Sequence, residues 1–187
     1  MAVVDVADDT KREDRRTRYT KQVIREAFFE LLREKGFDKM SVADICRRAD
    51  INRGTFYLHY VDKYDLLDAL IDEALDEEPP FDEREHTLCQ RVPVNDDYRL
   101  LYQGDETLPH VMRHIIERGG AASIPEIMER SGLDEEMARM AFIFAASGNM
   151  AVNKQMGWKR SKRFNEVQAL MREIFYAGLD HVGRRSG

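Results

Sequence analysis

The spacing of apolar residues along the chain predicts a protein built from helices. Apolar side chains return every three to four positions in most segments, whereas almost no segment alternates apolar and polar residues as a half-buried strand does. The clearest stripe is that of the first helix, formed by Val23, Ile24, Ala27, Phe28, Leu31 and Leu32. The expected helices cover approximately residues 20–35, 41–49, 52–59, 62–78, 108–116, 123–131, 134–156 and 162–182, with shorter helical pieces between 81 and 104. We therefore expect an all-α fold.

Capping residues predict where the first helices begin and end. Gly36 stands where a helix ends in a left-handed residue. Ser41 and Asp44 have the spacing of a capping box, in which two side chains accept hydrogen bonds from exposed amides. Asn52 is a favourable N-cap for the short helix that follows a tight turn. Two short helices therefore follow the first long one.

Prolines and glycines predict where the later helices end. Pro79 and Pro80 stop the fourth helix and mark the expected domain boundary, because proline cannot continue a helix. The Gly119-Gly120 pair and Gly132 are each expected to end a helix of the carboxyl-terminal part.

The charge of the chain is unevenly distributed. The 187 residues carry a net charge of −6, but residues 11–63 hold 14 Lys and Arg against 9 Asp and Glu, a net charge of +5. Residues 64–187 hold 15 against 23, a net charge of −8, and the first ten residues contribute −3. A basic module attached to an acidic body is typical of a DNA-binding head on a domain with another task. A chance fluctuation in surface charge is the alternative.

Hydropathy and cysteine usage indicate a soluble protein of the cytoplasm. The mean hydropathy is −0.57, and no apolar run approaches the roughly 18–20 residues that span a bilayer. The start of the chain lacks a positive region followed by an apolar stretch, so we expect no secretion signal. Cys46 and Cys89 have no CxxC partner, which argues against a disulfide framework or a four-thiolate zinc site.

A helix-turn-helix motif is the most specific feature of the sequence. The segment 52–60 reads Asn-Arg-Gly-Thr-Phe-Tyr-Leu-His-Tyr, and 62–67 reads Asp-Lys-Tyr-Asp-Leu-Leu. Both strongly resemble the DNA-binding domain of the TetR family of bacterial transcriptional regulators. Upstream matches are Ala27, Phe28, Leu31, Lys35-Gly36-Phe37, Ser41-Val42-Ala43-Asp44-Ile45 and Ala49. The resemblance runs without gaps from about Arg16 to Leu75.

The resemblance implies a homeodomain-like helix-turn-helix domain followed by a helical effector and dimerisation domain. We expect a flexible amino-terminal arm over residues 1–15, a DNA-binding domain over 16–78 with its helix-turn-helix at about 41–60, and a carboxyl-terminal domain over 79–187. The family's last two helices form a two-fold interface, so the segments 134–156 and 162–182 are expected to make a homodimer. Such a dimer presents two recognition helices to a palindromic operator in double-stranded DNA.

The first residues of a recognition helix contact base edges, and here these are Arg53, Gly54 and Thr55. Arg53 is suited to donate two hydrogen bonds to guanine, a contact worth about 1–3 kcal/mol of discrimination. Gly54 costs about 1 kcal/mol relative to alanine inside a helix, which favours a close approach to DNA. Thr55 offers a hydroxyl and a methyl group to a base, and Asn52 caps the helix that carries all three.

Phosphate contacts are expected from residues around the recognition helix. Tyr57 and His59 lie off the face formed by the apolar residues of this helix and match family members that use them on phosphates. Lys63 places a cation in the first turn of the next helix, where the helix dipole favours an anion, so a phosphate partner explains it. Ser41 and the amides beside it form another phosphate site.

Each of these residues also has a purely structural interpretation. Tyr57 can be half-buried packing, His59 a solvated helix end, and Lys63 an ordinary surface lysine. Leu58 departs from the polar residue that many family members carry there, which leaves the base preference at this position open. The basic cluster at the amino terminus is either an arm on DNA or a solvated tail; it consists of Lys11, Arg12, Arg15, Arg16 and Arg18.

The family usually holds an effector pocket within its carboxyl-terminal helices. Candidate pocket residues, which core packing explains equally well, are Tyr102, Met112, Met137, Phe144, Met150 and Trp158. The effector is an unidentified small molecule, and the operator and regulated genes are also open. A repressor released by its effector is favoured over an activator, and a helical adaptor that has lost DNA binding is the remaining alternative.

We expect no enzyme, cofactor or metal. No nucleophile–base arrangement, phosphate-binding glycine loop or close carboxylate pair stands out. His110 and His114 have ligand spacing on a helix, and His86 with Cys89 offers a second pair, but nothing indicates that the two pairs meet. Cys46 lies on an apolar helix face, where thiols are usually inert.

Overall fold

The computed structural model describes residues 6–77, 95–159 and 161–186, and within these ranges it contains eight helices and no strand. The predicted all-α class is therefore confirmed. The chain divides into two compact units, Met1–Leu70 and Ile71–Gly187. The division falls inside the continuous helix α4 (Lys63–Asp76), whereas the boundary expected at Pro79-Pro80 lies outside the described residues. None of the described helices combines the length and apolar content needed to cross a membrane.

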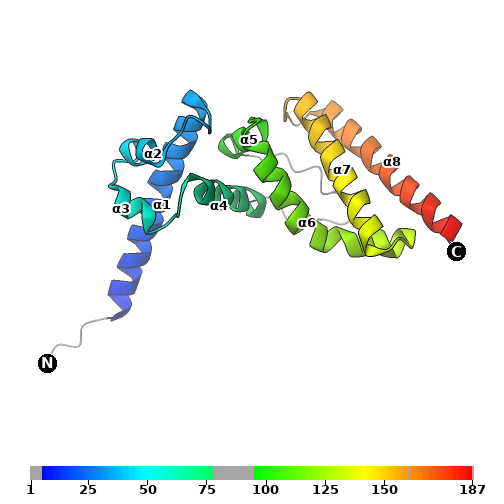
Figure 1. The fold of residues 1–187 in the computed structure, drawn as a ribbon, viewed down its shortest axis with the longest axis horizontal. Coiled ribbons are helices and arrows are strands. Elements are labelled where there is room, and N and C mark those ends of the chain that lie inside the picture. Colours follow the sequence, from blue (N-terminus) through cyan, green and yellow to red (C-terminus); the bar gives the residue numbers. More distant parts are fainter. Residues whose placement is uncertain (1–5, 78–94, 160, 187) are drawn as a thin grey trace. The chain divides into compact units, whose positions relative to one another are not determined.

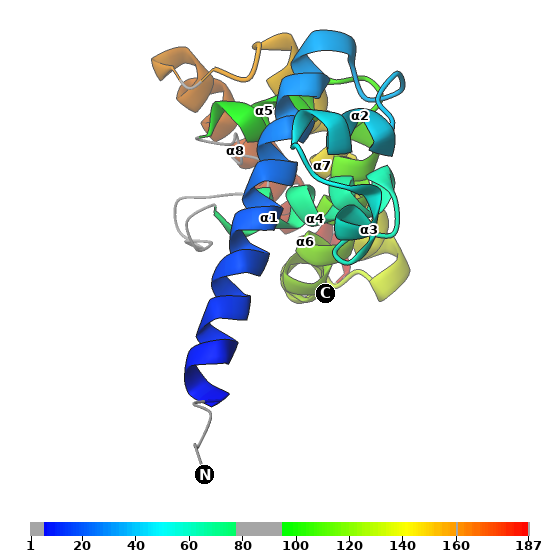
Figure 2. The ribbon, with the colours of Figure 1, turned by 90° about the vertical axis from the view of Figure 1, so that its left-hand side faces the viewer.

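The first unit is built on the long helix α1 (Val6–Lys35). The short helices α2 (Val42–Arg48) and α3 (Arg53–Tyr57) lie beside it, and α4 follows (Figures 1 and 2). Fully buried side chains contributed by all four helices and the α1–α2 turn form the core, and each of them stabilises the fold by about 1.5–3 kcal/mol. They are Ile24, Phe28, Phe29, Phe37, Ile45, Phe56, Leu66 and Leu67.

The start of α1 differs from the prediction. The helix was expected from about Thr20, with a flexible arm over residues 1–15, but it begins at Val6. Residues 6–19 contain neither glycine nor proline, so nothing in this segment stops the helix from extending toward the amino terminus. Because each added residue extends the helix at little cost once it is nucleated, the basic segment continues α1.

The second unit contains four further helices, α5 (Asp96–Gln103), α6 (Leu108–Ser131), α7 (Glu135–Gln155) and α8 (Lys162–Ser186). Helix α6 contacts α5, α7 and α8, and α7 also contacts α8, which runs beside it in Figure 1. The buried residues of this unit include Tyr98, Leu101, Tyr102, Val111, Ile127, Ala138, Phe142, Trp158, Phe164 and Leu179.

Helix α6 does not end at Gly119-Gly120 as predicted. It continues through Pro125 to Ser131 and ends at Gly132, whose left-handed φ of 68° agrees with the expected stop. A Cβ at Gly120 would lie 3.2 Å from Ile124 Cδ1 and 3.8 Å from the Phe142 ring. The glycine therefore serves the close approach of α7 to α6, and the packing gained there keeps the helix continuous.

A pair of buried amides links α7 to α8. Gln168 Nε2 donates a hydrogen bond of 2.7 Å to Asn153 Oδ1, and both residues are almost completely buried. Because burying an unpaired amide is costly, this bond is a specific requirement of the α7–α8 contact.

The outer faces of α7 and α8 expose large apolar side chains. Met137, Met140 and Phe144 lie at helical spacing on α7, with Phe144 76% exposed, and Leu170 and Ile174 lie four apart on α8. Contiguous exposed apolar surface of this kind marks interaction sites in soluble proteins.

Candidate nucleic-acid interface

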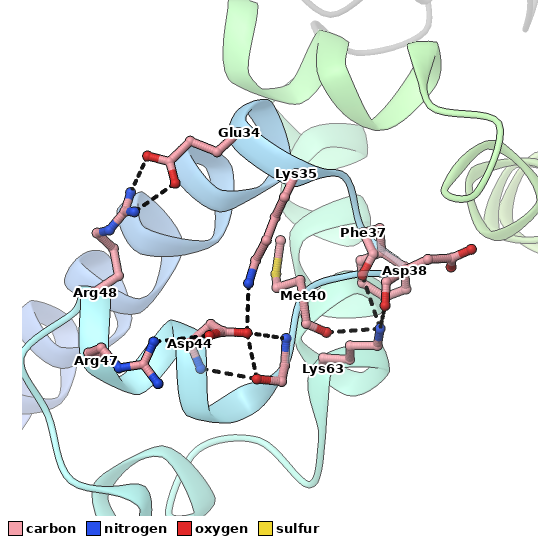
Figure 3. A network of polar contacts seen from close by, with 10 residues as sticks. Glu34, Lys35, Phe37, Asp38, Met40, Asp44, Arg47, Arg48 and Lys63 are labelled. Carbon is pink, nitrogen blue, oxygen red and sulfur yellow. Dashed lines mark hydrogen bonds and ion pairs between the residues drawn. The ribbon is translucent and has the colours of Figure 1, made fainter.

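Helix α2 begins with the predicted capping box. The Asp44 amide donates to Ser41 Oγ at 3.2 Å, and the Ser41 amide donates to Asp44 Oδ2 at 3.1 Å. The same carboxylate accepts a 2.6 Å bond from the Ser41 hydroxyl and pairs with Lys35 at 2.7 Å (Figure 3). The Lys35 ammonium and these bonds from Ser41 hold the pKa of Asp44 well below its usual range. The start of α2 is thus fixed to the end of α1.

A second set of charges fixes the other end of α2 to α1. Arg48 donates from both terminal nitrogens to Glu34, at 2.9 and 2.7 Å, and to Glu30 at 2.9 Å. A guanidinium that grips one carboxylate with two bonds has a defined geometry as well as a favourable charge. Helix α2 is therefore held against α1 near each of its ends.

The turn into α3 is formed by Asp50 and Asn52. Asp50 adopts a left-handed φ of 52°, which aspartate tolerates better than most residues. Asn52 caps α3 as predicted, because its Oδ1 accepts a 2.8 Å hydrogen bond from the Thr55 amide. A Cβ at Gly54 would lie only 3.1 Å from this oxygen. Room for the cap is thus a reason for the glycine in addition to the predicted approach to DNA.

Helix α3 has one buried and one exposed face. Phe56 is fully buried, whereas Arg53 and Gly54 are exposed and Thr55 is half-buried. The three residues expected to contact base edges therefore lie at the start of the helix, on an anchored element.

Aromatic contacts support the residues that follow. The Tyr57 ring meets the Phe56 ring edge-on, with centroids 5.5 Å apart, while 55% of Tyr57 remains exposed. His59 is half-buried beside the Tyr60 ring, and Leu58 is 81% exposed. The predicted phosphate contacts of Tyr57 and His59 are compatible with these positions and stay predictions.

Lys63 has partners that its sequence position did not suggest. Its ammonium donates to the backbone carbonyl oxygens of Phe37, Asp38 and Met40, in the turn between α1 and α2 (Figure 3). Sequence reasoning missed this contact because the partners are 23 to 26 positions away in the chain. Its predicted phosphate contact stays a prediction.

Residues 24–70 match the family model described as bacterial regulatory proteins, tetR family. The chain carries a TetR-family helix-turn-helix domain. It is 35% identical over 74 residues to YxbF, an uncharacterized HTH-type transcriptional regulator of Bacillus subtilis (strain 168). It is 40% identical over 52 residues to YvdT, another such regulator of that strain. These alignments cover 39% and 28% of this chain, and 20% and 27% of the two relatives.

The match to the tetR family spans the elements that carry the interface. Residues 24–70 include most of α1, all of α2 and α3, and the first half of α4. The predicted site residues Ser41, Asn52, Arg53, Gly54, Thr55, Tyr57, His59 and Lys63 all fall within it. The TetR-type domain is thus supported by its helices, its caps and its similarity to known regulators.

The six predicted effector residues of the second unit, which lies beyond the tetR match, occupy different environments. Tyr102 and Trp158 are buried against each other with ring centroids 5.3 Å apart, Met150 is buried, and Met112 is half-buried. Met137 and Phe144 instead lie on the exposed apolar face of α7. A hollow between α6 and α7 is lined by other residues, among them Gly120, Ile124, Met128 and Arg139. The effector pocket stays a prediction.

The predicted metal ligands are not gathered within the described residues. The ring of the buried His114 lies 3.0 Å from Asp72, and His110 is half-buried. No group of three His, Cys, Asp or Glu side chains suited to a metal occurs in the part of the chain that the structure describes. His86 and Cys89 lie outside that part.

The thiol of the TetR-type domain has the environment expected from the sequence. Cys46 is buried on the inner face of α2, and this burial raises the pKa of its thiol. A thiol held in its neutral form is a poor nucleophile.

Proposed function

We propose that this protein is a dimeric, sequence-specific transcriptional regulator of the bacterial cytoplasm. In this proposal it represses transcription from a palindromic operator and is released by a small-molecule effector. The observation that carries the proposal is the α3 surface within the TetR-type domain. There Arg53, Gly54 and Thr55 occupy the exposed start of a helix anchored by Phe56, the arrangement with which recognition helices enter the major groove.

The charges around α3 fit a nucleic-acid partner. Residues 11–63 carry a net charge of +5, with 14 Lys and Arg against 9 Asp and Glu. In the proposed complex Arg53 donates to a guanine, Thr55 contacts a neighbouring base, and Ser41, Tyr57 and His59 contact phosphates. Phosphate contacts orient the protein on DNA, and base contacts provide the sequence preference.

Dimerisation is proposed through the outer faces of α7 and α8. Met137, Met140 and Phe144 on one helix, with Leu170 and Ile174 on the other, supply the apolar area that a four-helix interface requires. A two-fold interface repeats the same surface on both subunits and presents two copies of α3 to two half-sites.

The test is selection of bound DNA from a random pool by the purified full chain, followed by footprinting upstream of its own gene. We expect recovery of a two-fold symmetric site. Failure to enrich any sequence would reject the proposal. Repression would be tested by placing the recovered site before a reporter promoter, where an increase in transcription would indicate an activator instead.

A further inference from the structure

We propose that Lys63 is a positioning residue that clamps the two ends of the helix-turn-helix together, and that it does not bind a DNA phosphate. The inference deepens the proposed DNA-binding function and rests on it for its second measurement. Its first measurement, the stability of the protein without DNA, is independent of that function.

The ammonium of Lys63 has a complete set of hydrogen-bond partners. Its Nζ lies 3.0 Å from the carbonyl oxygen of Phe37, 3.3 Å from that of Asp38 and 3.1 Å from that of Met40 (Figure 3). An ammonium has three N–H donors and no acceptor. Three donors therefore meet three acceptors, and a phosphate would have to displace at least one of these bonds.

Two aromatic rings flank the same ammonium. Lys63 Nζ lies 4.5 Å from the centroid of the Phe37 ring and 5.3 Å from that of Tyr64. The two rings contact each other edge-on, with centroids 5.2 Å apart, and Phe37 is buried. Cations are attracted to aromatic faces, more strongly where water is partly excluded. The rings thus add to the preference of the ammonium for this position.

The carbonyl cluster also explains why a cation occupies the first turn of α4. The helix dipole places partial positive charge at this end, which disfavours lysine. The three carbonyl oxygens supply the compensating negative charge within the protein. No phosphate is needed to account for Lys63.

The position of the clamp in the chain defines what it positions. The carbonyl partners end at Met40, immediately before the α2 cap Ser41, and Lys63 is the first residue of α4. The residues between these two points, 41–62, comprise α2, the turn and α3. One side chain therefore joins the entry of the helix-turn-helix to its exit.

The experiment compares Lys63→Met, Lys63→Arg and the control Lys39→Met, which removes an exposed lysine from the same turn. Thermal unfolding is measured without DNA. Affinity for the operator selected by the unaltered protein is then measured at several salt concentrations, at temperatures where each variant is folded.

We expect both Lys63 variants to lower the melting temperature by several degrees and the DNA affinity about tenfold, with Lys39→Met close to the unaltered protein. Arginine should not rescue the clamp, because its planar fork cannot direct three donors from one atom. The slope of log affinity against log salt should not change, since no phosphate contact is lost.

Two results would overturn the proposal. One is full recovery of DNA affinity and stability by Lys63→Arg, because arginine binds phosphate well. The other is an unchanged melting temperature for Lys63→Met together with a salt slope reduced by about 0.9 for each lost phosphate contact. If the unaltered protein selects no DNA, the proposed function fails, and the melting temperatures alone decide whether the clamp exists.

Discussion

The ring Nδ1 of His114 lies 3.0 Å from a carboxylate oxygen of Asp72, joining α6 to the second half of α4. His114 is buried, and Arg118 pairs with the same Asp72 oxygen at 3.2 Å and also with Asp76. Both cationic side chains of α6 therefore depend on one carboxylate of α4. The contact lies entirely within the second unit of the chain.

Replacing Asp72 by alanine should destabilise the second unit by about 1–3 kcal/mol, because the buried His114 ring loses a hydrogen-bond partner. Asp72→Asn should cost less, since an amide oxygen can still accept. Urea unfolding of the full chain measures both changes. Glu129→Ala, on the exposed side of α6, is the control. Equal costs for Asp72→Ala and Glu129→Ala would show that the contact contributes nothing.

Arg53→Ala should relax the base preference at one position in each half-site, with a loss of about 1–3 kcal/mol of discrimination. The reason is that a bidentate contact distinguishes guanine from other bases, whereas phosphate contacts do not. Repeating the random-pool selection with the variant measures the change. Lys21→Ala removes an exposed cation of α1 and should leave the selected sequence unaltered. An unchanged preference in the Arg53 variant would exclude a base contact.

The stability of the first unit should fall in acid partly through Asp44. Bonds from Lys35 and Ser41 lower the pKa of this carboxyl in the folded state. A lowered folded pKa gives stability that is present above the unfolded value of about 4 and is lost as the pH falls toward the folded value. Unfolding measured from pH 6 to pH 2 should therefore show a shallower acid loss in Asp44→Asn than in the unaltered protein. The same change at exposed Glu26 serves as the control, and an identical acid profile for the unaltered protein and Asp44→Asn would contradict this account.

Phe144→Asp should weaken the proposed dimer, because it places a charge at the centre of the apolar face of α7. Phe144 is 76% exposed in the single chain, so the helical fold should survive, as circular dichroism would show. Light scattering at micromolar concentration should give about the mass of one 21.8 kDa chain for the variant and twice that for the unaltered protein. Ala122→Asp adds the same charge at an exposed position of α6 and should leave the dimer intact. A variant that stays dimeric would place the interface elsewhere.

Local signals in the sequence predicted the caps of the helix-turn-helix correctly. Ser41, Asp44 and Asn52 each bond to amides within three residues, so their roles follow from spacing alone. Gly132 ends α6 for the same kind of reason, through its left-handed φ.

Contacts between distant parts of the chain were not predictable in this way. The carbonyl partners of Lys63 lie more than twenty positions earlier, and no spacing rule connects them. Gly120 was interpreted as a helix stop because its neighbour in α7, Phe142, cannot be identified from the sequence. For the proposed pocket residues, an apolar side chain at helical spacing does not reveal whether it lies inside, as Met150 does, or outside, as Phe144 does.

The buried bond between Gln168 and Asn153 has a consequence for the register of the two terminal helices. A shift of α8 along α7 by one turn would separate the two amides and bury both without a partner, at a cost of about 1–3 kcal/mol for each. An interface made only of apolar side chains would tolerate such sliding more readily, because apolar contacts are not directional. One hydrogen bond on the inner side of α7 and α8 thus fixes which residues stand next to each other on the outer side.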